Sequence, residues 1–236
     1  MKTAPLYLIP VPLGETKISK VLPPFNKDII LSIHHFIVEN VRTARRFLKQ
    51  VEPKINPDNL IFYTLNQHVS PAEISDFIQP AENGFPLGVI SEAGCPAIAD
   101  PGADIVAIAQ KKGIRVVPLV GPSSILLALM ASGFNGQNFA FNGYLPVESE
   151  ARIKSLKSLE KRVYSEYQTQ LFIETPYRNK KMVETILQTC RPHTKLCIAA
   201  DITLETEWIV TLSVSEWKKQ ILPDLAKHPC IFALYV

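Results

Sequence analysis

Short runs of apolar residues alternate with segments of helical spacing along the first half of the chain. The runs LYLIPV, IILSIHHFIV, LIFYTL, PLGVIS and RVVPLV occupy residues 6–11, 29–38, 60–65, 86–91 and 115–120 and have the length of buried strands. Strands that alternate with helices are typical of a parallel sheet. We therefore predict an N-terminal α/β domain with a mainly parallel five-stranded sheet and flanking helices.

Two helices in this half have clear end signals. The first is expected to begin at Asp100 as N-cap, with Pro101 in its first turn, and to end at Gly113. The second begins near Ser123 or Ser124 and ends at Gly133. Its body, ILLALMA, is apolar on all sides, which predicts a helix buried between layers.

The pattern restarts near residue 138 with strand-like and helical segments in a different arrangement. Shorter alternating strands such as EWIVTLS favour a mixed sheet in this part. The loop-like stretch GFNGQN separates the two patterns, so we predict an N-terminal α/β domain over 1–135 and a C-terminal α/β domain over 136–236. A cofactor cleft between the two domains is expected, since small-molecule sites are common there.

Composition narrows the class of protein only slightly. The chain has 236 residues, 47% of them hydrophobic, and a formal charge of +3, which neither implies nor excludes RNA binding. The four cysteines and five histidines show no metal-binding spacing, so we expect reduced thiols and no metal. No apolar run reaches the length of a membrane span and no export signal is evident, which predicts a cytoplasmic protein without membrane contact.

Three loops that follow predicted strands are rich in small residues. They are VPLGET at 11–16, SEAGCPAIADPG at 91–102 and VGPSS at 120–124. The carboxyl ends of parallel strands meet at one sheet edge, so these loops are expected to converge on a ligand pocket, although tight turns before ordinary helices would leave the same pattern. None matches a dinucleotide or triphosphate loop.

These loops also carry a resemblance that covers most of the chain. SEAGCPAIADPG, RVVPLVGPSSILLALMASGF, FAFNGYLP and FIETPYR, in this order and spacing, resemble the tetrapyrrole-methylase superfamily of S-adenosylmethionine-dependent methyltransferases. Within that superfamily the chain looks most like the branch that 2'-O-methylates a cytidine of small-subunit ribosomal RNA. Four motifs agree, and each of them would be weak alone.

The resemblance implies a homodimer of two-domain α/β subunits that binds folded S-adenosyl-L-methionine in the interdomain cleft. The cofactor-binding residues that it implies are Pro12, Leu13, Gly14, Ala93, Gly94, Cys95, Ile98, Ser123, Ser124, Ile173 and Ala200. The chain departs from the branch in two motifs. It has Glu92 and Cys95 where SDAGTP is usual, and Asn40 and Val41 within the motif that is usually EDTR. The resemblance places these positions at the edges of the substrate and cofactor sites.

Methyl transfer from a sulfonium mainly requires in-line positioning, but a ribose hydroxyl is a poor nucleophile that a carboxylate can help to deprotonate. The candidate catalytic residues are Glu174, Arg178, Glu39 and Arg42. For each of them, an Arg to Glu pair that only holds two loops together is an equally good interpretation.

Cations on a predicted helix offer a surface for the ribosomal RNA or small ribosomal subunit that the resemblance implies. They are Arg152, Lys154, Lys157, Lys161 and Arg162, and a solvated helix face would explain them as well. Two other functions stay open at this point. One is methylation of a tetrapyrrole-like small molecule, and the other is a catalytically degenerate RNA-binding or assembly factor.

Overall fold

The computed structural model describes residues 3–65 and 71–236 and divides the chain into two compact units after Ser123. The first unit contains a five-stranded parallel sheet in the order β3-β2-β4-β1-β5. Its strands are β1 (Leu6–Ile9), β2 (His35–Val38), β3 (Ile61–Thr64), β4 (Leu87–Ile90) and β5 (Val116–Pro118). The prediction of a parallel five-stranded sheet is confirmed.

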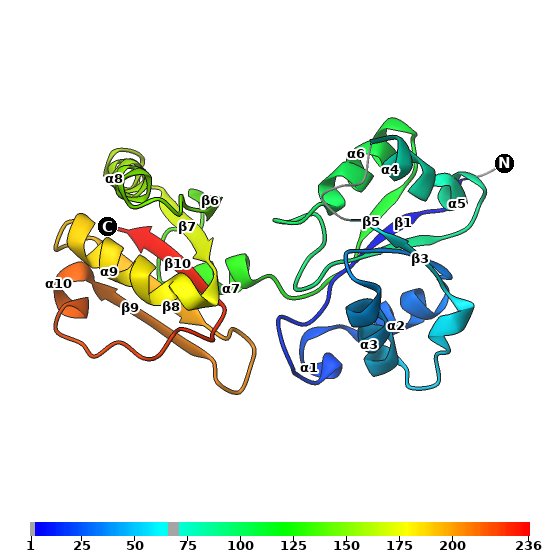
Figure 1. The fold of residues 1–236 in the computed structure, drawn as a ribbon, viewed down its shortest axis with the longest axis horizontal. Helices are drawn as coiled ribbons and strands as arrows, with labels where there is room; N and C mark the ends of the chain where they lie inside the picture. Colours follow the sequence, from blue (N-terminus) through cyan, green and yellow to red (C-terminus); the bar gives the residue numbers. More distant parts are fainter. Residues whose placement is uncertain (1–2, 66–70) are drawn as a thin grey trace. The chain divides into compact units, whose positions relative to one another are not determined.

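Helices cover both faces of the first sheet (Figure 1). On one face lie α1 (Ile18–Val21), α2 (Pro24–Leu31) and α3 (Val41–Val51), and on the other lie α4 (Pro71–Phe77), α5 (Gln79–Glu82) and α6 (Gly102–Lys111). A single 3-10 turn, η1 (Pro57–Asn59), precedes β3. The central strand β4 is buried along its whole length because it is covered from both sides. All five strands end at the same edge of the sheet, which leaves the loops after them grouped together.

One predicted strand is wrong in part. The apolar run 29–38 is not a single strand, because its first residues form the end of α2 and only His35–Val38 join the sheet. Pro24 at the first helical position favours the helix, and Ser32 ends it. Ile30 and Ile33 are buried on either side of this turn, so the helix end and the strand start read as one apolar run.

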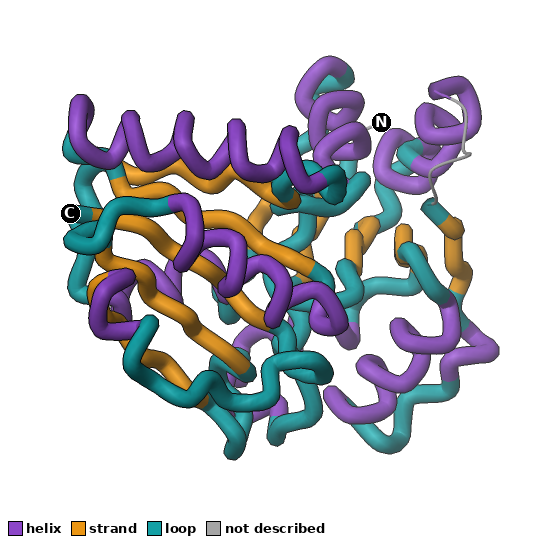
Figure 2. Tube along the Cα trace, turned by 60° about the vertical axis from the view of Figure 1, so that its left-hand side comes forward, coloured by secondary structure: helices purple, strands orange, loops and turns teal. Residues whose placement is uncertain are grey.

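The second unit contains a mixed sheet in the order β6-β7-β10-β8-β9, as predicted. Only β6 (Phe139–Tyr144) and β7 (Thr169–Glu174) pair in parallel, while β8 (Lys195–Ala200), β9 (Trp208–Ser213) and β10 (Cys230–Tyr235) join by antiparallel pairs. The long helix α8 (Ser149–Glu166) and α9 (Asn179–Thr189) pack on one face (Figure 2). Phe172 and Phe232 stack in the core beneath them. The short helix α10 (Val214–Trp217) completes this core.

The helix α7 (Ser124–Ser132) packs on β8, β9 and β10 of the second sheet. The Thr211 hydroxyl donates a hydrogen bond of 3.0 Å to the Ser132 carbonyl, which fixes the end of the helix to β9. The predicted boundary at residue 135 placed this helix in the first domain, whereas its contacts place it in the second unit. Its expected burial on all sides is also wrong, because Leu126 and Met130 are 50% and 78% exposed.

Within the described ranges, no helix is long and apolar enough to span a membrane. The four cysteines are free thiols, three of them buried.

Candidate functional site

The three small-residue loops of the first unit meet at the carboxyl edge of its sheet, as predicted. The loop after β1 and the loop after β4 are joined by a two-residue bridge, in which the Val11 and Gly94 amides donate to each other's carbonyls at 2.9 and 3.2 Å. The Cys95 thiol donates to the Pro122 carbonyl of the third loop at 3.4 Å. Hydrogen bonds therefore hold all three loops together.

Gly94 lies where the first and third loops approach each other closely. Its φ is +72°, and a Cβ atom on it would lie 3.2 Å from Leu13 Cδ2 and 3.4 Å from the Pro122 carbonyl oxygen. Both the conformation and the space therefore favour glycine. Ala97 and Ala99, further along the same loop, also have positive φ values of 66° and 60°, and such strained backbone is found most often at functional sites.

The Asp100 carboxylate shapes the end of this loop. One of its oxygens accepts hydrogen bonds of 2.8 Å from the Ala97 and Gly102 amides. The helix α6 begins at Gly102, so Asp100 stabilises its start although it is not the N-cap that we predicted. Burial raises the pKa of the Asp100 carboxyl, while the two amide bonds oppose this rise.

The predicted cofactor residues of the first unit differ in how much surface they offer. Pro12 and Leu13 are half-buried, Gly14 and Ala93 are exposed, and Ile98 is 53% exposed. Ser123 ends the first unit, and Ser124 begins α7 in the second unit.

Glu39 and Arg42 follow the neighbouring strand β2. The Asn40 side chain accepts a hydrogen bond of 2.9 Å from the Arg42 amide and caps α3. Since asparagine and aspartate cap a helix equally well, Asn40 retains this structural role. Glu92, another of the four departures from the usual motifs, accepts a hydrogen bond of 2.6 Å from the Thr43 hydroxyl. Asn40 and Glu92 are thus accommodated at this sheet edge.

Carboxylates crowd around Glu39. Burial raises the pKa of the Glu39 carboxyl, and the negative charges of Asp100 and Glu92 raise it further, against a hydrogen bond from the Glu92 backbone. The folded protein therefore holds a proton on Glu39 to higher pH than the unfolded chain does. Ionisation of Glu39 removes stability as the pH rises from the ordinary value of 4.5 through the raised value.

We therefore expect Glu39→Gln to raise the melting temperature at pH 7, because glutamine keeps the hydrogen bond without the charge. This gain should shrink below about pH 4, where Glu39 is protonated in both states. Thermal denaturation at the two pH values measures the effect, with Glu15→Gln, an exposed loop carboxylate, as control. A gain of equal size at both pH values would contradict this account.

The second unit holds the other candidate pair at the end of β7. Glu174, whose side chain is 1% exposed, accepts hydrogen bonds at Oε1 from Arg178 Nε at 2.8 Å and from the Thr175 amide at 2.7 Å. Arg178 Nη2 lies 2.7 Å from the same oxygen, and the guanidinium also lies 5.1 Å from the centre of the Tyr177 ring. Arg178 is the last residue of the single turn η2 (Pro176–Arg178). Its hydrogen bond to Glu174 raises the pKa of the Arg178 guanidinium. The carboxylate and guanidinium thus form one pair at the sheet end.

Glu174, Cys230 and Ala200 form a row across three neighbouring strands. Ala200 is buried in the core of this unit, so its side chain packs against the protein. Only the backbone of Ala200 is therefore suited to contact a ligand. Ile173, one residue earlier on β7, is half-buried.

Sequence analysis missed a polar cluster immediately after β8. His228 Nδ1 lies 2.5 Å from an Asp201 carboxylate oxygen, which also accepts a 2.6 Å hydrogen bond from the Thr206 hydroxyl. Asp201 and Thr203 have positive φ values of 50° and 74°, and the buried Thr203 Oγ1 has no hydrogen-bond partner in the described part of the chain. The aspartate directly after a buried strand was the only local signal, because its partner lies 27 residues away.

The first-unit edge suits S-adenosyl-L-methionine in the kind of groups that it offers. A Cβ on Gly94 would narrow the space between the first and third loops. The carboxylates of Glu39, Glu92 and Asp100 are grouped at the same edge, where their negative charge suits a cationic sulfonium. Within the described residues there is no cluster of metal-ligating side chains.

The chain is similar in sequence and in fold to proteins that are named as methyltransferases. No protein-family model matches the chain. "Ribosomal RNA small subunit methyltransferase I" of Vibrio cholerae is 27% identical over 219 residues, which cover 93% of this chain and 72% of that protein. The protein of the same name from Bacillus subtilis is 28% identical over 213 residues, 89% of this chain and 68% of that protein.

Two solved structures share the fold. The methyltransferase CobJ superposes with a TM-score of 0.64 at 13% identity, covering 99% of this chain and 94% of its own. Uroporphyrin-III C-methyltransferase from Thermus thermophilus, in complex with S-adenosyl homocysteine, has a TM-score of 0.58 at 14% identity and coverages of 98% and 97%. By sequence the chain is similar to proteins named ribosomal RNA small subunit methyltransferase I, and it shares its fold with the methyltransferase CobJ and with uroporphyrin-III C-methyltransferase.

Proposed function

We propose that this chain transfers a methyl group from S-adenosyl-L-methionine to the 2'-hydroxyl of a cytidine in small-subunit ribosomal RNA. The observation that carries the proposal is similarity along 93% of the chain, through both units, to a protein named for methylation of small-subunit ribosomal RNA. The strand-end loops around Gly94 support it, because they form an edge that suits the cofactor. The roles of individual residues are proposed together with this function.

The bound cofactor supplies a methyl group already activated by its positive sulfur. The loops of the first unit, with Pro12, Leu13 and Gly94, are proposed to hold the cofactor through backbone groups and close packing. Ile173 and Ala200 are proposed to contact it from the second unit. The protein must therefore orient the cofactor and the acceptor, exclude water, and help to remove the proton of the ribose hydroxyl.

Four side chains are proposed to act near the reacting atoms. Glu39, with its raised pKa, is suited to take up a proton from a hydroxyl group at a pH where an ordinary carboxylate is a weaker base. Arg42 lies three residues further on, at the start of α3. In the second unit, the ion pair of Glu174 and Arg178 offers a carboxylate and a guanidinium fixed relative to one another.

The decisive experiment measures cofactor binding and methyl transfer together. Calorimetry with S-adenosyl-L-methionine should show binding, and labelled methyl groups should appear in small ribosomal subunits or in their RNA. Transfer to porphyrinogens alone would assign the chain to small-molecule methylation, which is the reaction type of the solved neighbours named for uroporphyrin-III. Absence of cofactor binding would instead indicate a catalytically degenerate RNA-binding or assembly factor.

We also propose a cytoplasmic homodimer. A ribosomal RNA acceptor requires a protein that works where ribosomal subunits are assembled. Exposed apolar side chains such as Leu126, Met130 and Tyr144 would be covered by a second copy more favourably than by water. Sedimentation equilibrium measures the mass in solution, and a monomer at micromolar concentration would contradict the dimer.

Only part of the cationic helix predicted to bind RNA faces solvent. Lys154, Lys157 and Lys161 lie exposed along one side of α8. Arg152 is buried and donates to the Val147 carbonyl at 2.8 Å, and Arg162 Nη2 donates to Gln168 at 2.5 Å. These two arginines are therefore structural, and the lysines alone stay as candidates.

Replacing Lys154, Lys157 and Lys161 together with glutamine is expected to weaken RNA binding. Three lost phosphate contacts would lower the slope of log affinity against log salt by about 2 for single-stranded RNA. Fluorescence anisotropy across a salt series measures this slope, and affinity for S-adenosyl-L-methionine should stay at the parental value. An unchanged slope would show that these lysines do not contact RNA phosphates and form an ordinary solvated helix face.

A further inference from the structure

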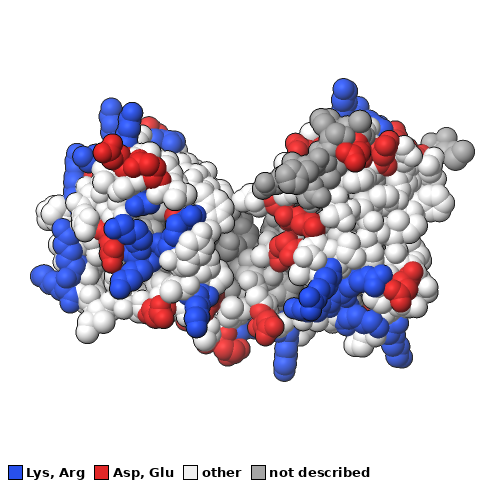
Figure 3. All heavy atoms as spheres, in the orientation of Figure 1, with Lys and Arg blue, Asp and Glu red and all other residues white. Residues whose placement is uncertain are grey.

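The helix α3 presents a row of cations on its exposed side. Arg42, Arg45, Arg46 and Lys49 follow one another at spacings of three, one and three residues, which places them on one face. The opposite face, with Phe47 and Leu48, is buried against the sheet. Figure 3 shows Lys and Arg side chains gathered over the part of the first unit that contains α2 and α3 in Figure 1.

Most of this positive charge is not neutralised by the protein. Arg45 pairs with Asp58 at 3.0 Å. Among the described residues, no carboxylate lies within 4.0 Å of the charged atoms of Arg42, Arg46 or Lys49. An exposed row of cations without counter-charges creates a positive potential that attracts polyanions.

Two hollows adjoin the helix α3. The smaller, of about 200 Å³, lies between α3, the loop after β1 and the loop after β4, and Arg46 lines it. The larger, of about 520 Å³, lies between α1, α2 and the end of α3. Gln50 lines both, so the hollows follow one another along α3 from the strand-end loops to the short helix α1.

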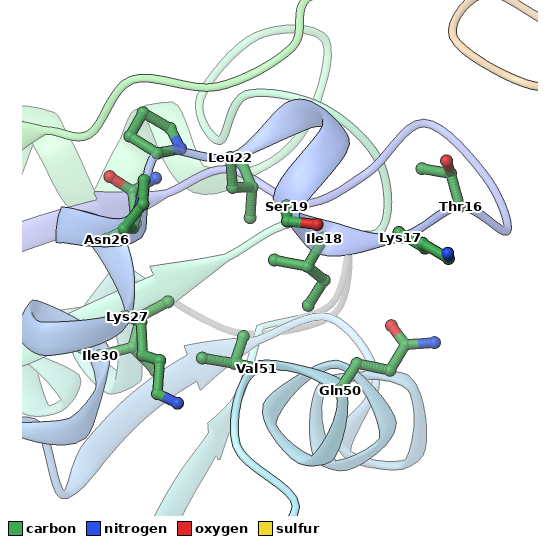
Figure 4. A pocket seen from close by; sticks show the side chains of 12 residues that line it. Thr16, Lys17, Ile18, Ser19, Leu22, Asn26, Lys27, Ile30, Gln50 and Val51 are labelled. Carbon is green, nitrogen blue, oxygen red and sulfur yellow. The ribbon is translucent and has the colours of Figure 1, made fainter.

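The larger hollow combines apolar walls with polar ends. Figure 4 shows Ile18 and Val51 directed toward the same space from α1 and α3, with Lys17 and Lys27 at opposite ends of the view. Lys27 is paired with Glu52 at 2.7 Å, whereas no carboxylate in the described ranges lies within 4.0 Å of the Lys17 ammonium. The volume lies within the range of about 300–1,000 Å³ that is usual for small-ligand pockets.

We propose that this face of the first unit binds single-stranded RNA next to the methylated nucleotide, with phosphates on Arg46 and Lys49 and an unstacked nucleotide in the larger hollow. The inference rests on the proposed function, since it assumes an RNA acceptor. Single strands suit the site because an unstacked base has an apolar face for Ile18 and Val51, whereas a stacked duplex could not enter a hollow.

The carboxylates of the smaller hollow indicate which side of the RNA strand faces the strand-end loops. Glu15 comes from the loop after β1 and Glu92 from the loop after β4, while Arg46 comes from α3. Carboxylates repel phosphates and accept hydrogen bonds from ribose hydroxyls. The sugar edge of the strand is therefore placed against the loops, and its phosphates are placed against α3.

The first test removes the proposed phosphate contacts. We expect Arg46→Gln with Lys49→Gln to lower affinity for a single-stranded transcript of small-subunit RNA by about tenfold and the salt slope by about 1.4. The matched control, Lys111→Gln with Arg115→Gln, removes two exposed cations elsewhere in the same unit and should have little effect. Equal losses in the two double variants, or an unchanged slope in the first, would overturn the proposal.

The second test locates the nucleotide directly. Transcripts carrying 4-thiouridine are cross-linked to the unaltered protein, and the modified peptides are found by mass spectrometry. Cross-links are expected within residues 16–30 or 50–51, and Ser19→Trp should suppress them by filling the hollow. Cross-links that fall only outside these segments would contradict the nucleotide site.

The parental protein separates the failure of this inference from failure of the proposed function. A parent that methylates RNA while both tests fail would overturn only the α3 site. A parent that binds S-adenosyl-L-methionine but neither binds nor methylates RNA would overturn the proposed function as well.

Discussion

Gly94→Val is expected to lower affinity for S-adenosyl-L-methionine by more than about tenfold, which equals about 1.4 kcal/mol of binding free energy. The valine Cβ would already lie 3.2 Å from Leu13 Cδ2, and its two methyl groups extend further into the space between the loops. The same change also disturbs the bridge with Val11, which holds the loops after β1 and β4 together. Calorimetry of the folded variant measures the loss.

Backbone strain alone could mimic this effect, so a control must carry the same strain elsewhere. Gly94 has a φ of +72°, and a side chain in this conformation costs about 1–2 kcal/mol of stability. Gly113 in the same unit has a φ of +67°, and a Cβ placed on it has no atom within 4 Å. Gly113→Val should therefore lose similar stability and keep parental cofactor affinity.

The two variants together test where the cofactor binds. Similar melting temperatures with a selective loss of binding in Gly94→Val would support the pocket at the first-unit edge. Parental affinity in a folded Gly94→Val protein would show that the cofactor lies elsewhere. Equal losses of affinity in both variants would attribute the effect to general destabilisation.

The meeting of the three loops was predictable because it follows from topology. Parallel strands must end at one edge, so small residues after β1, β4 and β5 converge once the strands are recognised. The contacts that fix the loops, such as the Cys95 thiol on the Pro122 carbonyl, depend on side-chain geometry that no local pattern encodes.

Features that depend on distant partners were missed or misplaced. The apolar residues of α7 indicate burial, but not which sheet covers them, and the helix packs on strands that follow much later in the chain, with Thr211 bonded to Ser132 across 79 positions. The contact between the Asp201 carboxylate and the His228 ring joins residues 27 positions apart. The hollows beside α3 require three elements to be placed in space before any of their lining residues stands out.

Glu174→Gln is expected to reduce both stability and turnover. The Glu174 carboxylate is almost fully buried and accepts hydrogen bonds from Arg178 and from the Thr175 amide. Glutamine keeps the shape of the side chain but loses its charge. A hydrogen bond to a charged group contributes about 1.5–3 kcal/mol to the stability of the fold. Part of the effect is therefore structural, and a lower melting temperature alone would say nothing about catalysis.

Glu160→Gln provides the matched control in the same unit. Glu160 is 7% exposed and accepts hydrogen bonds of 2.6 Å from the Arg191 amide and the Thr194 hydroxyl. It thus stabilises a turn from a buried position, as Glu174 does, but it is not one of the residues proposed to bind the cofactor or to act in the reaction. Its replacement should lower the melting temperature and leave turnover of the folded protein near the parental value.

The comparison isolates the chemical contribution of Glu174. If the carboxylate acts near the reacting atoms, turnover of folded Glu174→Gln should fall by more than about tenfold, equivalent to about 1.4 kcal/mol on the barrier, at a temperature where Glu160→Gln retains its activity. Methyl transfer and thermal denaturation are measured on the same preparations, so that only folded protein is counted. Near-parental turnover in both variants would show that Glu174 only orients Arg178, and the search for a catalytic carboxylate would then move to Glu39 at the edge of the first sheet.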